Sequence, residues 1–202
     1  MDVTRKAPIG RPRGFDADVA LERAMLVFWE QGYEGASLAD LTTAMGITKT
    51  SMYAAFGNKE NLFRKALERY LEGPAAYTAL AMHEPTARAV ATAFLAGAVS
   101  ACTLPGSPSG CMTVQGALAA GEPGHTARDL LVSLRGTGQE HLRDRFARAV
   151  DEGDLPAGAD PAMLARYVMT VGNGIAVQAA GGATRDQLQR VADAALRNWP
   201  PI

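Results

Sequence analysis

The sequence predicts an all-α protein, in which an N-terminal three-helix domain of the helix-turn-helix type precedes a larger C-terminal helical domain. Three observations support this fold class. Apolar residues recur at spacings of three and four along most of the chain, the period of one face of an α-helix. Residues that cap helices precede many of these patterns, and glycine or proline follows them. The alternating apolar and polar runs typical of β-strands do not occur in the sequence.

The first predicted helix follows a polar arm, residues 1–14, which is expected to be flexible. Asp16 is a suitable N-cap, because its carboxylate can accept from free amides in the first turn. The apolar residues that follow have helical spacing: Ala20, Leu21, Ala24, Met25, Val27 and Phe28. Gly32 is expected to end this helix, and the segment GYEGAS to form the next connection.

Two short helices and a longer one are predicted next. Ser37 and Asp40 have the spacing of a capping box, and this short helix should stop at Gly46, since glycine tolerates the left-handed conformation at a helix end. Thr48 can cap a second short helix that continues to about Phe56. Asn58 can then cap a longer helix from Lys59 to Glu72. The spacing of five apolar residues predicts that they face the first helix, which supports the two short helices: Leu41, Met45, Ile47, Met52 and Phe56.

Gly73-Pro74 is the strongest interruption of the helical pattern and predicts a domain boundary. We therefore expect an arm at residues 1–14, a helix-turn-helix domain at 15–72 that includes the connecting helix, and a second helical domain at 73–202. Further helices are expected at about 86–102, 111–120, 125–152 (with a bend at Gly136 and Gly138), 161–180 and 184–198.

Composition narrows the class of protein. The net charge of −1 excludes a basic surface over the whole chain, but Arg5, Lys6, Arg11 and Arg13 face only Asp2 in the arm. Two cysteines suit a reducing cytoplasm, and prolines and glycine interrupt any signal-peptide core. The most apolar run, residues 89–104, is shorter than the ~20 residues that span a bilayer. A cytoplasmic protein without a membrane segment is expected.

A helix-turn-helix can place its second helix in the major groove of DNA. The segment Thr48-Lys49-Thr50-Ser51-Met52-Tyr53-Ala54-Ala55 offers hydroxyls, one ammonium and small side chains that permit close approach. The pattern alone leaves a second interpretation open, because helix-turn-helix geometry also occurs in helical hairpins that bind no DNA.

The run from GRPRGFD through GYEGASLADLTTAMGITKTSMYAAFGNKENLF resembles the TetR/AcrR family of bacterial transcription regulators. The matching residues share the order and spacing of the family pattern: Phe28, Gly32, Tyr33, Ser37, Leu38, Ile47, Tyr53, Phe56, Lys59, Glu60 and Leu62. This resemblance covers about the first third of the chain. The remainder is similar only as an all-helical architecture.

The resemblance implies a homodimer that binds a palindromic operator in double-stranded DNA, with half-sites about one helical turn apart. It further implies a repressor that a small-molecule effector releases. Matched to the family, Thr48, Lys49 and Thr50 would approach bases or nearby phosphates, and Tyr53 and Lys59 would hold phosphate. Ser37 and Thr42 are weaker phosphate candidates.

The sequence departs from the family at Ala54 and Ala55, where an aromatic residue or histidine is frequent. Two possible backbone contacts are therefore missing. Arg11 and Arg13 of the arm could replace part of these DNA contacts by reaching an adjacent minor groove or its phosphates. The alternative is an arm that only increases solubility.

The C-terminal domain is expected to hold an effector pocket lined by Tyr77, Met82, Phe94, Met112 and Leu134. Cys102 and Cys111 flank the loop LPGSPSG. They could form a redox pair or bind a soft metal together with Met112 or His83, which would make the protein a redox- or metal-sensing regulator. Alternatively, they are buried thiols that act as small hydrophobes. The expected dimer interface is Val168, Val171, Gly172, Ile175 and Ala179.

An enzyme is disfavoured. His83, His125 and His141 lack the spacing of metal ligands, and the segments at 106–110 and 172–174 lack the rest of any nucleotide-binding fingerprint. No cofactor and no metal site is predicted. The remaining alternative to a DNA-binding regulator is a ligand-binding helical dimer without a role on DNA.

Overall fold

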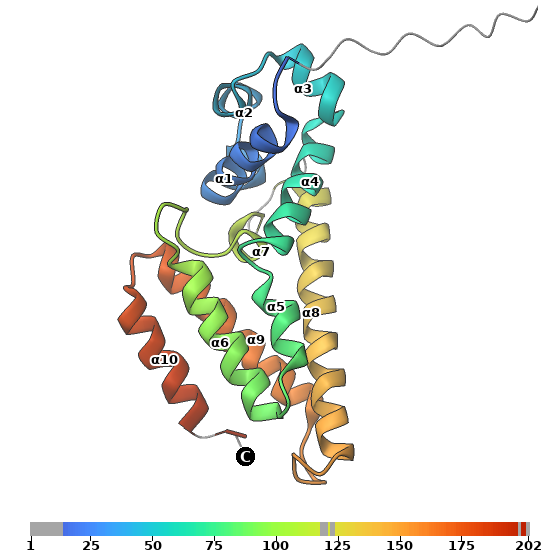
Figure 1. Cartoon of the computed structure of the whole chain (residues 1–202), viewed down its shortest axis with the longest axis vertical. Coiled ribbons are helices and arrows are strands. Elements are labelled where there is room, and N and C mark those ends of the chain that lie inside the picture. The colour runs from blue at the N-terminus through green and yellow to red at the C-terminus, as the bar shows by residue number, and fades with distance from the viewer. Residues whose placement is uncertain (1–13, 118–120, 122–123, 198, 201–202) are drawn as a thin grey trace, which may run out of the picture.

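A computed structural model of the protein describes residues 14–117, 121, 124–197 and 199–200. Every regular element in these residues is helical, which confirms the predicted all-α class. The first four helices form a compact N-terminal group, and the remaining helices form a longer bundle beside and below it (Figure 1). In chain order the elements are α1 (Ala17–Gly35), α2 (Leu38–Met45), α3 (Lys49–Phe56), α4 (Lys59–Glu72), α5 (Tyr77–Leu80), the 3₁₀ helix η1 (Ala81–His83), α6 (Ala87–Cys102), α7 (Met112–Gln115), α8 (His125–Asp151), α9 (Pro161–Ala180) and α10 (Arg185–Arg197).

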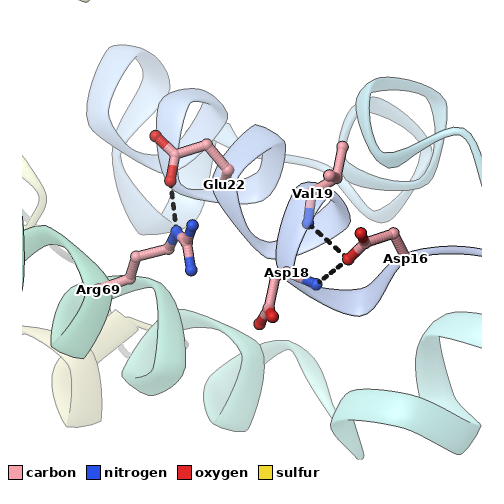
Figure 2. Close-up of polar contacts among 5 residues, drawn as sticks. All are labelled: Asp16, Asp18, Val19, Glu22 and Arg69. Atoms are coloured by element: carbon pink, nitrogen blue, oxygen red, sulfur yellow. Dashed lines mark hydrogen bonds and ion pairs between the residues drawn. The ribbon is translucent and has the colours of Figure 1, made fainter.

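The predicted N-caps are all present. Asp16 Oδ1 accepts from the amides of Asp18 and Val19 at 2.9 and 3.2 Å (Figure 2). Ser37 and Asp40 form the capping box, and Thr48 and Asn58 cap α3 and α4. Each cap pairs amides that a helix start leaves free, so short helices are fixed at defined ends.

An aromatic cluster holds α1 against α4. The ring of Phe63 meets those of Phe28 and Tyr33 edge-on, each at a centroid distance of 5.1 Å. Arg69 of α4 also pairs with Glu22 of α1 (Figure 2), but both side chains are well exposed, so the pair adds little stability. The N-terminal group is therefore held mainly by apolar packing, to which the predicted residues Leu41, Met45, Met52 and Phe56 contribute as buried side chains.

Helix α9 is the centre of the C-terminal domain, because it packs against α6, α8 and α10. Its buried face includes Leu164, Val168 and Ile175. Helix α8 extends over the whole length of this domain and reaches the level of α4 (Figure 1). Among the described residues, no helix is both long enough and apolar enough to cross a membrane.

The N-terminal group is joined to the bundle through the segment Gly110–Gly116, which contains α7. The indole Nε1 of Trp29 donates to the Gly110 carbonyl at 3.1 Å, and the Tyr33 amide donates to the Gly116 carbonyl at 2.8 Å. Gly32 lies between these bonds at φ 70°, and a Cβ there would meet the Gly116 carbonyl oxygen at 3.1 Å. Two features of the kink therefore favour glycine at position 32: the positive φ angle, and the close approach of its Cα to the Gly116 carbonyl.

Three details of the predicted elements were wrong. Helix α1 kinks at Gly32 but resumes to Gly35, because the bond from the Tyr33 amide to the Gly116 carbonyl holds the chain beyond the kink. Helix α7 has only 4 residues instead of the predicted span to 120, and residues 118–120 lie outside the described part. Helix α8 runs without interruption through Gly136 and Gly138, which face open space. A long helix with good neighbours tolerates the modest cost of glycine.

We expect Gly32→Ala to destabilise the protein by about 2 kcal/mol, because alanine at positive φ is strained and its Cβ would push against Gly116. Gly35→Ala is the matched control, since its Cβ would meet only the Gln31 side chain at an ordinary 3.5 Å. Urea unfolding of both variants measures the difference. Equal stability of the two variants would show that the kink does not constrain this junction.

Candidate nucleic-acid interface

Helix α3 has one buried and one exposed face. Met52 is 0% exposed and Phe56 6%, so these side chains anchor the helix on the core. On the other face, Thr48, Lys49 and Thr50 are exposed, and Tyr53 is 42% exposed. The structure therefore brings together four of the predicted contact residues on one accessible surface. Their contact with DNA remains a prediction.

The turn between α2 and α3 sets the angle at which this face is presented. Gly46 has φ 68° and ψ 32°, the left-handed conformation that favours glycine. The Ile47 amide donates to the Thr42 carbonyl at 3.1 Å, and the half-buried Ile47 side chain packs on the core. The turn is thus closed by backbone bonds and anchored by one apolar side chain.

The exposed face of α3 carries a cation and an aromatic hydroxyl one helical turn apart. Lys49 Nζ lies 6.0 Å from the centroid of the Tyr53 ring. Both side chains can extend toward an anionic ligand without uncovering the core. Arg23 of α1, which the sequence did not identify as a contact residue, lies beside the turn: its Nη1 is 3.5 Å from where a Cβ of Gly46 would be. The signal that the sequence offered for this residue was an arginine on the predicted first helix.

Three of the predicted hydroxyl contacts are already engaged within the chain. Ser37 Oγ donates to the Asp40 carboxylate, and these hydrogen bonds lower the pKa of Asp40, so a negative charge stands beside the hydroxyl. Thr42 Oγ1 donates to the Leu38 carbonyl at 2.8 Å. Thr48 Oγ1 accepts from the Ser51 amide at 3.1 Å and lies 3.0 Å from Ser51 Oγ, and it can still donate when Ser51 is the donor of that pair. Ser37 and Thr42 are therefore weaker candidates for phosphate than Thr48.

Lys59 packs on the first helix instead of extending freely. Its Nζ lies 4.6 Å from the centroid of the Tyr33 ring, a cation–π contact. Burial lowers the pKa of Lys59, while Glu34 opposes this shift. Burial has the opposite effect on the neutral acid Tyr33: it raises the pKa of Tyr33, with a smaller contribution from Glu60. The predicted phosphate contact of Lys59 would have to compete with this packing.

Arg11 and Arg13 lie outside the described residues. The described chain begins at Gly14 and Phe15, which line a shallow hollow of about 350 Å³ together with Gly46, Ile47, Thr48, Ser51, Ala54 and Ala55. The point from which the arm departs is therefore next to the start of α3.

A second candidate site is a cavity of about 100 Å³ between α4, α5, α6, α7, α8 and α9. Of the predicted pocket residues, Tyr77, Phe94 and Leu134 line it. Met112 and Met82 do not: Met112 is fully buried in the core, and Met82 packs against the core elsewhere. Arg135 and Asn173 also line the cavity and were missed, since nothing in the sequence distinguishes them from surface residues.

Both cysteines are free and buried, and both line this cavity. The Tyr70 hydroxyl donates to Cys111 Sγ at 3.3 Å, and Thr113 Oγ1 lies 3.0 Å from the same sulfur. Burial, and then the nearby Cys111, raise the pKa of Cys102 to about 12. Among the described residues, no group of three His, Cys, Asp or Glu side chains could hold a metal ion.

The stripe predicted as a dimer interface lies mostly inside the single chain. Val168, Gly172, Ile175 and Ala179 are buried and Val171 is half-buried, because the stripe packs within the bundle. A Cβ on Gly172 would meet the Phe94 ring at 3.1 Å. The exposed large apolar side chains of α9 and α10 are Met163, Val177 and Val191. Val177 and Val191 line a groove of about 690 Å³ between these helices, and Val171 and Ile175 of the predicted stripe line it as well.

The comparisons with known proteins agree with this architecture. Residues 20–66 match the domain described as "Bacterial regulatory proteins, tetR family", and residues 87–195 match "Tetracyclin repressor-like, C-terminal domain". The chain belongs to the TetR family. It is thus a DNA-binding transcriptional regulator with the two-domain helical fold of that family.

Individual TetR family relatives are similar over nearly the whole chain. The HTH-type transcriptional repressor ComR of Escherichia coli (strain K12) is 33% identical over 199 residues, which cover 96% of this chain and 93% of ComR. The repressor BdcR of the same organism is 29% identical over 181 residues, 89% of this chain and 86% of BdcR. A cysteine mutant of the TetR family regulator CifR, solved with 26 bp double-strand operator DNA, is 44% identical with a TM-score of 0.89, covering 94% of this chain and 100% of that chain.

Proposed function

We propose that this TetR family regulator is a homodimeric repressor, which binds a palindromic operator through α3 and leaves it when a small effector occupies the internal cavity. The observation that carries the proposal is the exposed face of α3, with Lys49, Thr50 and Tyr53 accessible while Met52 fixes the helix on the core. Support comes from relatives named as repressors and from the similar chain solved on its operator DNA.

Effector response requires that the cavity and α3 share structural elements. Helix α4 supplies such an element: its first turn adjoins α3, and Leu71 near its end lines the cavity. The 14 residues of α4 form a rigid rod of about 20 Å. A ligand that fits the cavity in only one orientation of α4 would shift the population of the two DNA-binding geometries.

The arm is proposed to increase the affinity for DNA. Its described end, Gly14-Phe15, adjoins the start of α3, and four basic residues precede it in the sequence. Ala54 and Ala55 leave this side of α3 without long side chains. We infer that Arg11 and Arg13 contribute contacts to the adjacent minor groove or its phosphates.

The groove between α9 and α10 is the proposed dimer contact. Val177 and Val191 are each 51% exposed, and the groove between them is lined by further apolar residues of both helices. A second copy related by a two-fold axis would cover the same patch on both subunits.

The recognition surface can be tested on DNA obtained by an unbiased selection from random duplexes, which should yield an inverted repeat. We expect Lys49→Ala to weaken operator binding about tenfold and to reduce the slope of log affinity against log salt by about 1. Tyr53→Phe should also weaken binding, because it removes the exposed hydroxyl. Fluorescence anisotropy at several salt concentrations measures both effects.

Arg88→Ala is the matched control for charge, since Arg88 is exposed at the start of α6, at the opposite end of the molecule from α3 (Figure 1). All three variants should keep the oligomeric state and stability of the parent protein. Full operator affinity in both α3 variants would mean that this face is not the recognition surface.

The arm is tested by the double variant Arg11→Ala/Arg13→Ala. If both side chains neutralise phosphates, the salt slope should fall by about 2. Arg5→Ala/Lys6→Ala removes the same charge farther from α3 and should have a smaller effect. Equal losses in the two double variants would indicate that only the total charge of the arm matters.

The dimer contact is tested by Val177→Arg, which places a charge in the apolar groove. We expect the variant to sediment as a monomer and to lose operator binding, because one recognition helix alone contacts only half a site. Val132→Arg is the control, since Val132 is 52% exposed on α8, outside the groove. A dimeric Val177→Arg protein would exclude this groove as the interface.

A further inference from the structure

We propose that Cys111 is a covalent effector site that takes a short α,β-unsaturated aldehyde or ketone, and that the adduct releases DNA through the segment Gly110–Gly116. The proposal rests on the function proposed above and names the ligand class for its effector cavity. It is carried by three features: the position of the sulfur in the cavity wall, the groups around it, and the bonds of its segment to α1.

The two thiols in the cavity wall have different surroundings. Cys102, in the last turn of α6, has a pKa of about 12 and is protonated at neutral pH. Cys111 Sγ accepts a hydrogen bond from the Tyr70 hydroxyl at 3.3 Å and lies 3.0 Å from Thr113 Oγ1. The Tyr70 hydroxyl can stabilise the negative charge that develops on the sulfur as it reacts. Cys111 is therefore the nucleophile of the pair.

Arg135 adds a positive charge to the same wall. It lines the cavity, and its guanidinium donates to the Thr113 carbonyl two residues beyond Cys111. Burial lowers the pKa of Arg135, while the proximity of Cys111 raises it. The guanidinium is thus partly desolvated and close enough to the sulfur to interact with a ligand bound there.

The shape and lining of the cavity define the ligand. A volume of about 100 Å³ admits only a short molecule, and Phe94, Val114 and Leu134 favour an uncharged carbon chain. Arg135 and Asn173 can each donate to one oxygen. A short conjugated aldehyde or ketone has both an electrophilic carbon for Cys111 and a carbonyl oxygen for these donors.

The reaction is an addition that needs no oxidant and has no leaving group. Cys111 Sγ forms a bond to the β-carbon of the ligand, and the electron pair of the carbon–carbon double bond moves toward the carbonyl oxygen. Arg135 is placed to stabilise the resulting enolate oxygen. The α-carbon then takes up one proton, which replaces the proton that the thiol has lost, so the product is the sum of thiol and ligand.

The adduct would act on the DNA-binding domain through bonds that already exist. Gly110, next to Cys111, accepts from Trp29 Nε1 of α1, and Gly116 accepts from the Tyr33 amide. Tyr70, which donates to the sulfur, belongs to α4. We expect the added chain to occupy the cavity and to change the contact between the sulfur and Tyr70, which would shift α4 and the bonds of this segment to α1.

The experiment treats the full-length protein with methyl vinyl ketone and measures adducts by intact mass and peptide mapping, and DNA binding by anisotropy on the selected operator. We expect one adduct on Cys111 and loss of operator binding in the parent protein and in Cys102→Ser. Cys111→Ser should form no cavity adduct and should stay on the DNA. Tyr70→Phe should slow adduct formation about tenfold, because the sulfur loses a donor.

The Trp29→Phe variant distinguishes formation of the Cys111 adduct from its effect on DNA binding. This variant removes the indole donor to Gly110, and we expect it to form the Cys111 adduct at the parent rate but to lose less operator affinity on modification. Butanone, which has the same carbonyl but no electrophilic double bond, should not release the DNA. Release by butanone, or equal release from Cys111→Ser, would overturn the proposal.

Two other outcomes also decide against it. An adduct mapped to Cys102 would show that Cys111 is not the nucleophile. A Cys102–Cys111 disulfide that forms with hydrogen peroxide, and releases DNA where methyl vinyl ketone does not, would make the pair a redox sensor. If the untreated protein binds no DNA at all, the proposed function fails, whereas the adduct measurement still tests the reactivity of Cys111.

Discussion

The contact between α1 and the segment Gly110–Gly116 is the constraint on which the rest of the structure depends. Two hydrogen bonds, from Trp29 Nε1 and from the Tyr33 amide, join a DNA-binding domain to a bundle whose cavity lies directly behind the same segment. Because Gly32 allows the backbones to meet, one of these bonds joins two main-chain atoms, whereas the other uses the indole of the buried Trp29. Under the proposed effector response, a displacement of the cavity wall would reach α1 through these two bonds.

Helix α4 provides the second connection, and it differs physically from the first. Its contact with α1 consists mainly of buried rings and aliphatic side chains, with one exposed ion pair between Glu22 and Arg69. Apolar packing has no directional bonds and can slide by small amounts, whereas the bonds to Gly110 and Gly116 are directional.

The N-terminal domain could be predicted closely from the sequence because its signals are local. Ser37, Thr48 and Asn58 cap the helices that they were predicted to cap, and Met52 and Phe56 are buried as their spacing indicated. Capping and helical period involve residues a few positions apart, so one chain contains the whole signal. The exposed side of α3 followed from the same period.

The C-terminal domain could be predicted less well because its sites depend on residues far apart in the chain. The stripe that includes Val168 and Ile175 has the same composition whether it packs on α6 or on another subunit, and only the tertiary structure shows that it is internal. Arg135 is an ordinary charged residue of α8 until the fold places it in the cavity wall near Cys111. The hydroxyls of Ser37 and Thr42 show the same limit at short range, since their internal partners use the groups that a phosphate would need.

The small side chains on α3 also acquire a physical role from the fold. Ala54 and Ala55 would be lost contacts if α3 acted alone on the DNA, but together with Gly14 and Phe15 they form the hollow at the start of the described chain. Bulkier side chains at these positions would fill this hollow. Alanine instead leaves it open beside Gly14, the residue at which the described chain begins. In the proposed complex with DNA, charge on the tethered N-terminal segment would compensate for the side-chain contacts that Ala54 and Ala55 do not supply.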